Sequence, residues 1–173
     1  EYPLMHEGLI LYTYLHLAAD RPQLNALLQH KVKGVAYETL METDHSLPLL
    51  TPMSQIAGRL SVQEGAKCLE KHQGRRGVLL AGVPGTPKAK VVILGGGIVG
   101  TNACKMAIGL GADVRILDIS LPRLAFLDDI FGSRIQTLYS SDANIEESVA
   151  DADLVIGSVL IPGKAAPKIL KKS

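Results

Sequence analysis

The chain has 173 residues, 47% of them hydrophobic, which suits one domain or one domain with part of another. Its formal net charge of +1 comes from interspersed charges, which argues against nucleic acid or an anionic membrane as the principal partner. Aromatic residues make up 4%, without tryptophan, which argues against a base-stacking surface. No apolar run reaches the roughly 20 residues of a membrane span, and we expect a soluble, cytoplasmic protein.

The two cysteines, Cys68 and Cys104, each lie within a helical pattern. Neither has the spacing of a metal ligand set or a nearby histidine–cysteine partner, so we expect no metal site. Both are interpreted as small buried residues in a reducing compartment.

The N-terminal part of the chain has the pattern of a small α/β unit. Residues 9–16 form an apolar and aromatic run typical of a strand buried on both faces. Asp20 and Pro22 predict the start of a helix over residues 23–29, and residues 35–40 predict a second strand. A parallel sheet of two strands cannot cover itself, so this segment is interpreted as part of a second α/β domain.

A helix connects this unit to the rest of the chain. Thr51 as N-cap and Pro52 at the first helical position predict a helix that runs to about residue 71. We therefore predict a partial domain in residues 1–50 and a nucleotide-binding domain in residues 51–173, with the connecting helix over about residues 52–71.

The main motif follows a predicted strand at residues 90–94, where Gly95, Gly97 and Gly100 form G-x-G-x-x-G. The first glycine permits the tight turn, and the second has no Cβ to keep the backbone from a pyrophosphate. The third lets the next helix pack closely. That helix, from about Ile98, offers free N–H groups and a positive dipole end to phosphates. The alternative is an α/β turn without a ligand.

The following elements fit a dinucleotide-binding unit. A strand at residues 113–118 ends in Asp118, about 20 residues past the glycines, where a ribose-binding carboxylate is expected. The alternative for Asp118 is a turn residue at a strand end. The remaining predicted elements are a helix at 122–131, a strand at 135–139, a helix at 144–152 and a strand at 153–159. Together they predict a Rossmann-type, doubly wound parallel sheet.

Seven stretches of the chain are informative together, namely residues 1–5, 13–20, 50–54, 77–80, 95–102, 127–132 and 160–163. They give the chain a resemblance to the alanine dehydrogenase family. The glycine motif is generic, whereas residues 13–20 and 127–132 are specific in combination. The related transhydrogenase nucleotide domain shares the fold and the glycines, but its flanking stretches match less well.

The resemblance implies a homohexameric enzyme for the reversible, NAD-dependent oxidative deamination of L-alanine to pyruvate and ammonia. It also implies that residues 1–50 belong to the substrate domain and that the family's catalytic histidine falls on His16. Histidine suits proton transfer because its unperturbed pKa is near 6.5. The alternative for His16 is a buried structural histidine.

The resemblance also assigns the cofactor contacts. The glycine loop and Ile98 would hold the pyrophosphate, while Asp118 would bind the adenosine ribose and repel the extra phosphate of NADP. Further implied cofactor-binding residues are Arg123 and Ser140 near the adenosine, and Ser54, Val159 and Leu160 along the cofactor cleft. Alternatively, Arg123 is a surface charge, and Val159 and Leu160 belong to the core.

The resemblance further implies that some family residues lie outside this sequence. An arginine and a lysine that grip the substrate carboxylate are expected upstream of Glu1, and a catalytic aspartate beyond Leu170. We therefore hypothesise that the 173-residue chain alone binds NAD but turns over poorly. The competing hypothesis is a non-catalytic NAD(H)-binding module, such as a transhydrogenase-like domain.

Overall fold

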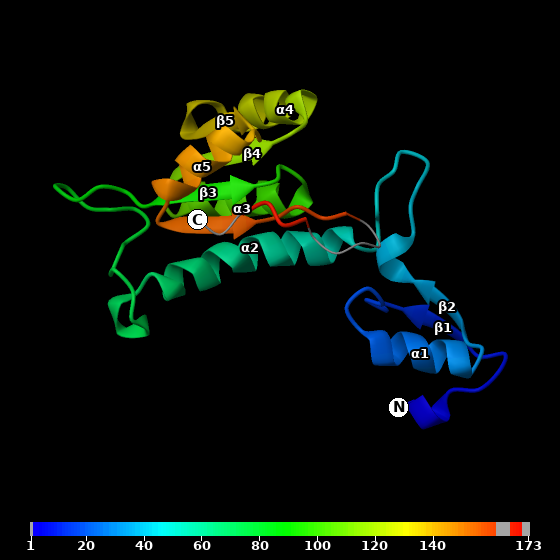
Figure 1. Ribbon diagram of the computed structural model, residues 1–173. Helices are drawn as coiled ribbons and strands as arrows, with labels where there is room; N and C mark the ends of the chain where they lie inside the picture. Colours follow the sequence, from blue (N-terminus) through cyan, green and yellow to red (C-terminus); the bar gives the residue numbers. More distant parts are fainter. Residues whose placement is uncertain (1, 162–166, 171–173) are drawn as a thin grey trace. The chain divides into compact units, whose positions relative to one another are not determined.

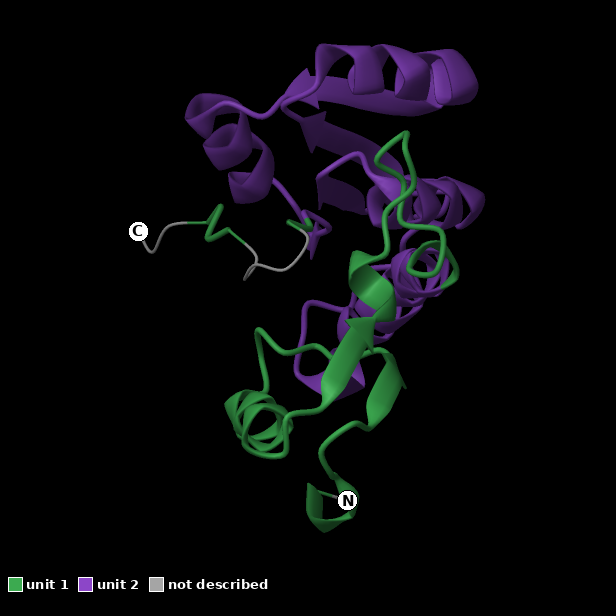
Figure 2. Ribbon diagram, turned by 90° about the vertical axis from the view of Figure 1, so that its right-hand side faces the viewer, with its two compact units in different colours: residues 1–52, 160–173 green, residues 53–159 purple. Residues whose placement is uncertain are grey.

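The computed structural model describes residues 2–161 and 167–170, and the chain forms two compact units. The first combines residues 1–52 with residues 160–173, and the second is residues 53–159 (Figure 2). The functional domains predicted above, with a boundary near residue 50, remain a prediction.

The first unit is built around a two-stranded parallel sheet (Figure 1). Its elements are η1 (Tyr2–Leu4), β1 (Ile10–Thr13), α1 (Arg21–Gln29), β2 (Lys33–Ala36) and η2 (Tyr37–Thr39). The strands pair from Ile10 opposite Lys33 to Thr13 opposite Ala36. The helix α1 connects them and begins at Arg21, two residues before the predicted range, and the Asp20 carboxylate caps it by accepting the Gln23 N–H at 2.9 Å.

The strands of this unit differ from those predicted. Burial of the first strand on both faces is wrong, since Ile10 is 66% exposed and Tyr12 52% exposed. The second strand begins two residues earlier than predicted and gives way to η2 at Tyr37. It includes Gly34, where a Cβ would come within 3.0 Å of the Leu15 side chain, so glycine here serves close packing.

The second unit is a Rossmann-type α/β layer structure. Its elements are α2 (Thr51–Cys68, which begins two residues before the unit), η3 (Lys71–Gln73), β3 (Lys90–Leu94), α3 (Ile98–Gly109), β4 (Asp113–Asp118), α4 (Leu121–Phe131), η4 (Gly132–Arg134), β5 (Ile135–Tyr139), α5 (Asp142–Ala150) and β6 (Leu154–Gly157). The four strands are all parallel and lie in the order β5-β4-β3-β6. This is the predicted doubly wound arrangement, in which the chain first moves outward from β3 and then returns to its other side.

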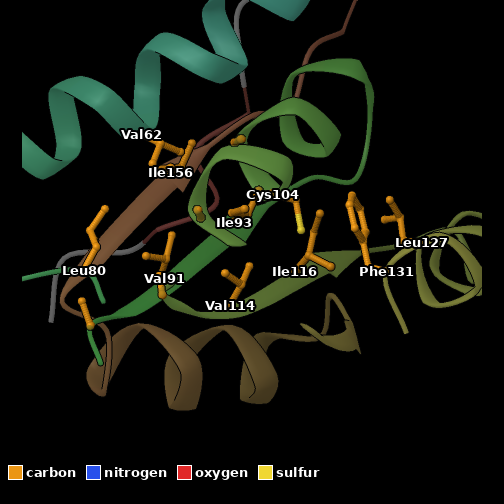
Figure 3. Packing of buried hydrophobic residues seen from close by; sticks show 14 of the residues in the cluster. Val62, Leu80, Val91, Ile93, Cys104, Val114, Ile116, Leu127, Phe131 and Ile156 are labelled. Atoms are coloured by element: carbon orange, nitrogen blue, oxygen red, sulfur yellow. The ribbon is translucent and has the colours of Figure 1, made fainter. Parts of the chain in front are cut away.

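The core of this unit lies between the sheet and the helices α2, α3 and α4 (Figure 3). Alternate residues of the strands point to this face, and Val62 of α2 lies beside Ile156 of β6 (Figure 3). The intervening residues Val92 and Leu94 of β3 are equally buried, and α5 lies on the opposite face (Figure 3). A central strand covered on both sides explains why residues 91–94 are continuously apolar.

Two details of the long helix were not predicted correctly. It ends at Cys68, three residues earlier than expected, and Cys68 is exposed rather than buried.

The other cysteine, Cys104, is fully buried as predicted, and this burial raises its pKa to about 12. Within the described ranges, no helix combines the length and apolar character needed to cross a membrane.

Candidate nucleotide site and candidate catalytic histidine

The carboxyl ends of the four parallel strands meet at one edge of the sheet in the second unit. Leu94 lies opposite both Leu117 and Gly157, so the segments that follow β3, β4 and β6 start side by side. The strand order reverses between β3 and β6, and ligands of open α/β sheets bind outside the carboxyl ends at such a point. The predicted glycine loop leaves β3 at this reversal.

The three motif glycines have distinct local roles. Gly95 has a φ of 105°, a backbone conformation that residues with a Cβ rarely adopt. At Gly100 a Cβ would come to 1.9 Å from the Gly95 carbonyl oxygen, so the helix start and the strand end touch. A Cβ on Gly97 would meet nothing within 4 Å. The first and third glycines shape the loop, whereas the second borders open space.

The Asp118 carboxylate faces the glycine loop. Its Oδ2 accepts the Gly96 N–H at 2.6 Å, and its Oδ1 accepts the Ser120 N–H at 2.8 Å. The backbone N–H of Ser140 donates to the Asp118 carbonyl oxygen at 3.0 Å, which places the ends of β4 and β5 together. A carboxylate has about four acceptor positions, so two remain for the hydroxyls of a ribose.

Arg123 lies against the glycine loop. Its Nε donates to the Gly96 carbonyl oxygen and its guanidinium also donates to Thr101 Oγ1, both at 2.6 Å. The guanidinium carbon lies 4.8 Å from the centre of the Phe126 ring, a cation–π distance. A free surface charge, the alternative considered for Arg123, does not fit these contacts.

Three further residues support the loop and were not predicted from the sequence. Ser158 Oγ contacts the carbonyl oxygens of Leu94 and Gly95 at 2.9 and 2.7 Å. Thr101 Oγ1 contacts the Gly97 carbonyl oxygen at 2.8 Å. A Cβ on Gly96 would lie 2.8 Å from the side chain of Leu127, so this position is crowded. The run of three glycines was the available signal for Gly96.

The remaining predicted cofactor residues differ in position. Ile98, the first residue of α3, is 40% exposed next to the loop, and the Val159 side chain borders Gly95. Ser54 is half-buried near the start of α2. Leu160 belongs to the first unit and is 56% exposed, so it is not a core residue. The structure thus gathers most of the predicted set around the loop, while the loop contacts described above involve neither Ser54 nor Leu160.

The loop has the features that a dinucleotide pyrophosphate requires. The N-cap of α3 is Gly97, which has no side chain to occupy the first N–H groups of the helix. The open space at this glycine gives an anion direct access to those groups and to the positive helix end. The residues present therefore fit a nucleotide with two linked phosphates.

The candidate catalytic histidine lies in the first unit, just beyond the end of β1. His16 is exposed, so the alternative of a buried structural histidine is wrong. Its ring stacks on the Tyr14 ring with centroids 6.4 Å apart and planes 16° apart. Its backbone has a φ of 49°, unusual for a residue with a side chain. An exposed imidazole is available to exchange protons with a substrate.

A separate hollow lies elsewhere in the second unit. A hollow lined by Lys88, Asp113 and Arg134, among others, lies at the amino ends of β3 and β4, at the opposite edge from the glycine loop. Among the residues that the structure describes, no group of three or more histidine, cysteine, aspartate or glutamate side chains could hold a metal ion.

The fold and the loop define the class as a Rossmann-type α/β protein of the dehydrogenase kind. The chain belongs to the alanine dehydrogenase/PNT family. Residues 1–57 match the family description "Alanine dehydrogenase/PNT, N-terminal domain", and residues 61–173 match "Alanine dehydrogenase/PNT, C-terminal domain".

Individual relatives agree with this membership. The chain is 58% identical over 172 residues to an alanine dehydrogenase of Methanococcus maripaludis, covering 99% of the chain and 46% of the relative. It is 56% identical over 170 residues to alanine dehydrogenase 2 of Staphylococcus aureus, covering 98% of the chain and again 46% of the relative. The chain thus spans about half the length of the curated relatives it matches.

Solved structures give the same result. An L-alanine dehydrogenase structure superposes with a TM-score of 0.87 at 58% identity, over 99% of this chain and 47% of that one. A transhydrogenase from Sinorhizobium meliloti superposes with a TM-score of 0.72 at 22% identity, over 94% of this chain and 47% of that one, which shows a shared fold.

Proposed function

We propose that the natural protein carrying this sequence is an NAD-dependent alanine dehydrogenase that interconverts L-alanine with pyruvate and ammonia. The observation that carries the proposal is the 58% identity to an alanine dehydrogenase along nearly the whole chain. The contact of Asp118 with the glycine loop supports the choice of NAD, because a carboxylate at the ribose disfavours the added phosphate of NADP.

The second unit supplies the nucleotide-binding part. The N–H groups at the start of α3 would hold the pyrophosphate, and the two free acceptor positions of Asp118 would bind the ribose hydroxyls. A bound nicotinamide cofactor would supply the hydride acceptor for the hydrogen on the α-carbon of alanine. The residues around Gly95 fix the backbone against which this nucleotide would lie.

The first unit supplies proton transfer. The His16 imidazole would hydrogen-bond the reacting nitrogen or oxygen of the substrate and move protons as the amine is replaced by a carbonyl group. Such transfers contribute roughly 10²–10⁴ in rate. We further propose a cytoplasmic homohexamer, in keeping with the resemblance described above.

The proposal is tested by following NADH formation from L-alanine with the natural protein. Turnover that requires L-alanine and NAD is expected, and NAD titration in the presence of pyruvate should reveal a ternary complex. NAD binding without turnover and without any effect of pyruvate would instead indicate a non-catalytic nucleotide-binding module.

The 173-residue chain should be assayed in parallel. We expect it to bind NAD through the second unit and to form little NADH. Turnover by the 173-residue chain at the rate of the natural protein would refute the hypothesis that further residues are needed for catalysis.

A further inference from the structure

The backbone at His16 is held in a conformation that needs an explanation. Among the described residues other than glycine, His16, Lys31 and His45 have positive φ values. Lys31 follows the end of α1, where left-handed residues are common, and His45 closes a hydrogen-bonded turn from Glu42. His16 instead follows a parallel strand, where this conformation is energetically unfavourable for a residue with a side chain.

The carboxylate of Glu38 stabilises this conformation. Its Oε1 accepts the His16 N–H at 2.7 Å, and both of its oxygens lie 3.2 Å from the Leu15 nitrogen and accept the Leu15 N–H. Two successive N–H groups thus converge on one anion, an arrangement that backbone nests use to bind anions. The contact follows from the sheet register. Thr13 lies opposite Ala36 at the carboxyl ends of β1 and β2, so the segments that follow the two strands leave the sheet at the same edge.

Neighbouring contacts fix the rest of this turn. The His16 carbonyl oxygen accepts the Ala19 N–H at 3.0 Å, and the Leu15 carbonyl oxygen accepts from Gln23 Nε2 at 2.7 Å. Leu15 is only 4% exposed, so the chain is anchored in the unit immediately before the histidine. The imidazole is exposed, and its position therefore depends mainly on the backbone that carries it and on the Tyr14 ring.

The charge of Glu38 is maintained at neutral pH. Burial alone would raise its pKa, but the backbone N–H groups of Glu38, His16 and Leu15, together with the charge of the His16 ring, lower the pKa below its usual value. A charged acceptor forms stronger hydrogen bonds to N–H groups than a neutral one. The hydrogen bonds from the Leu15 and His16 N–H groups to the Glu38 carboxylate, called the Glu38 clamp below, are therefore charge-assisted.

We propose that Glu38 is a positioning residue for catalysis, whose carboxylate holds the His16 backbone so that the imidazole meets the substrate in a fixed place. The proposal rests on the catalytic role proposed for His16. It assigns Glu38 no contact with substrate or cofactor, and its effect passes through the two N–H groups.

The variant Glu38→Gln tests the clamp in the natural protein. Its volume is nearly the same, but it loses the charge and turns one acceptor oxygen into an N–H donor that faces backbone donors. We expect kcat to fall about 10- to 100-fold, because small misplacements of reacting groups cost that much. The Kd for NAD should change by less than about twofold, since Glu38 does not belong to the nucleotide site.

A double-mutant cycle separates positioning from a general structural role. His16→Gly removes the imidazole and tolerates the positive φ. If Glu38 acts through His16, adding Glu38→Gln to His16→Gly should lower the residual turnover by less than about twofold. The proposal would be overturned if the two substitutions lowered turnover independently, so that their fold losses multiplied in the double variant.

Asp44→Asn provides a matched control. The Asp44 carboxylate accepts the Ser46 N–H at 2.9 Å in the same unit, so this variant also weakens a carboxylate–backbone bond, but away from His16. It should retain wild-type kcat. A Glu38→Gln variant with the same kcat as Asp44→Asn would overturn the proposal, provided that His16→Gly is strongly impaired.

The outcomes also separate this proposal from the proposed function. Wild-type turnover by His16→Gly would show that His16 is not a catalytic residue, and would therefore contradict the proposed function. Glu38→Asp, which keeps the charge on a shorter side chain, serves if Glu38→Gln does not fold. Its kcat should lie below that of the wild type with NAD affinity intact, and a wild-type kcat would contradict the clamp.

Discussion

The Asp118 carboxylate accepts the Gly96 N–H at 2.6 Å, so the acid expected to bind ribose also fixes the glycine loop. Replacing it with alanine would remove both functions at once. Asparagine removes the charge and keeps one acceptor oxygen, which can still accept the Gly96 N–H if its amide nitrogen takes the position facing the Ser120 N–H, so it disturbs the loop less than alanine does.

We predict that Asp118→Asn weakens NAD binding about 10- to 100-fold, because hydrogen bonds to a charged group contribute roughly 1.5–3 kcal/mol. Discrimination against NADP should fall at the same time, since the repulsive charge is gone. Titration of both nucleotides measures these effects. Asp113→Asn, at the start of the same strand, is the control, and unchanged NAD affinity in Asp118→Asn would contradict the ribose assignment.

Gly97→Ala should leave the fold intact and impair nucleotide binding. A Cβ there meets nothing within 4 Å, and the φ of −65° suits alanine. The methyl group would stand where a pyrophosphate approaches the backbone, so we predict at least about a tenfold rise in the Kd for NAD. Gly109→Ala, equally unobstructed at the other end of α3, should leave the Kd unchanged. Equal behaviour of the two variants would argue against the phosphate site.

Arg123→Met should loosen the glycine loop. The change removes the donors to the Gly96 carbonyl oxygen and Thr101 Oγ1, and we predict about tenfold weaker NAD binding with a modest loss of stability. The matched control is Arg134→Met, which removes a guanidinium bonded to the Phe131 carbonyl oxygen at the end of the same helix. If both variants bound NAD like the wild type, Arg123 would have no part in the site.

The lowered pKa of Glu38 predicts a loss of stability in acid. Burial alone would raise this pKa, but the N–H groups of Glu38, His16 and Leu15 lower it below the usual 4.5. Because the folded pKa is below the unfolded one, this contribution is complete above the unfolded value and is lost as pH falls through the folded value.

Urea unfolding at about pH 7 and about pH 3 tests this pH dependence. The midpoint of the wild type should exceed that of Glu38→Gln at the higher pH and approach it at the lower one. A difference that did not depend on pH would show that the Glu38 charge does not stabilise the fold.

Much of the second unit could be predicted from sequence because its signals are strong. The strands β3, β4 and β5 have the predicted bounds. The central strand β3 is apolar from Val91 to Leu94 and ends at the glycine motif, and β4 ends in the expected acid, Asp118. The first unit was predicted less well, because its strands have four residues each and are half exposed, which leaves little periodic pattern.

The site shows a similar division. Gly95, Gly100 and Asp118 could be predicted because each needs a particular residue type at a fixed distance along the chain. Ser158 and Glu38 could not, because their contacts join segments that only the sheet register brings together. The direction of the Arg123 guanidinium, toward Gly96 rather than into solvent, leaves no trace in the sequence either.

The glycine loop is held by contacts within the protein from Ser158, from Asp118 and from Arg123 with Thr101. Its conformational freedom is therefore already lost when the protein folds, so association with a nucleotide needs little further ordering of the loop. A lock-and-key encounter follows, with an association rate limited by diffusion and orientation rather than by a slow rearrangement of the loop.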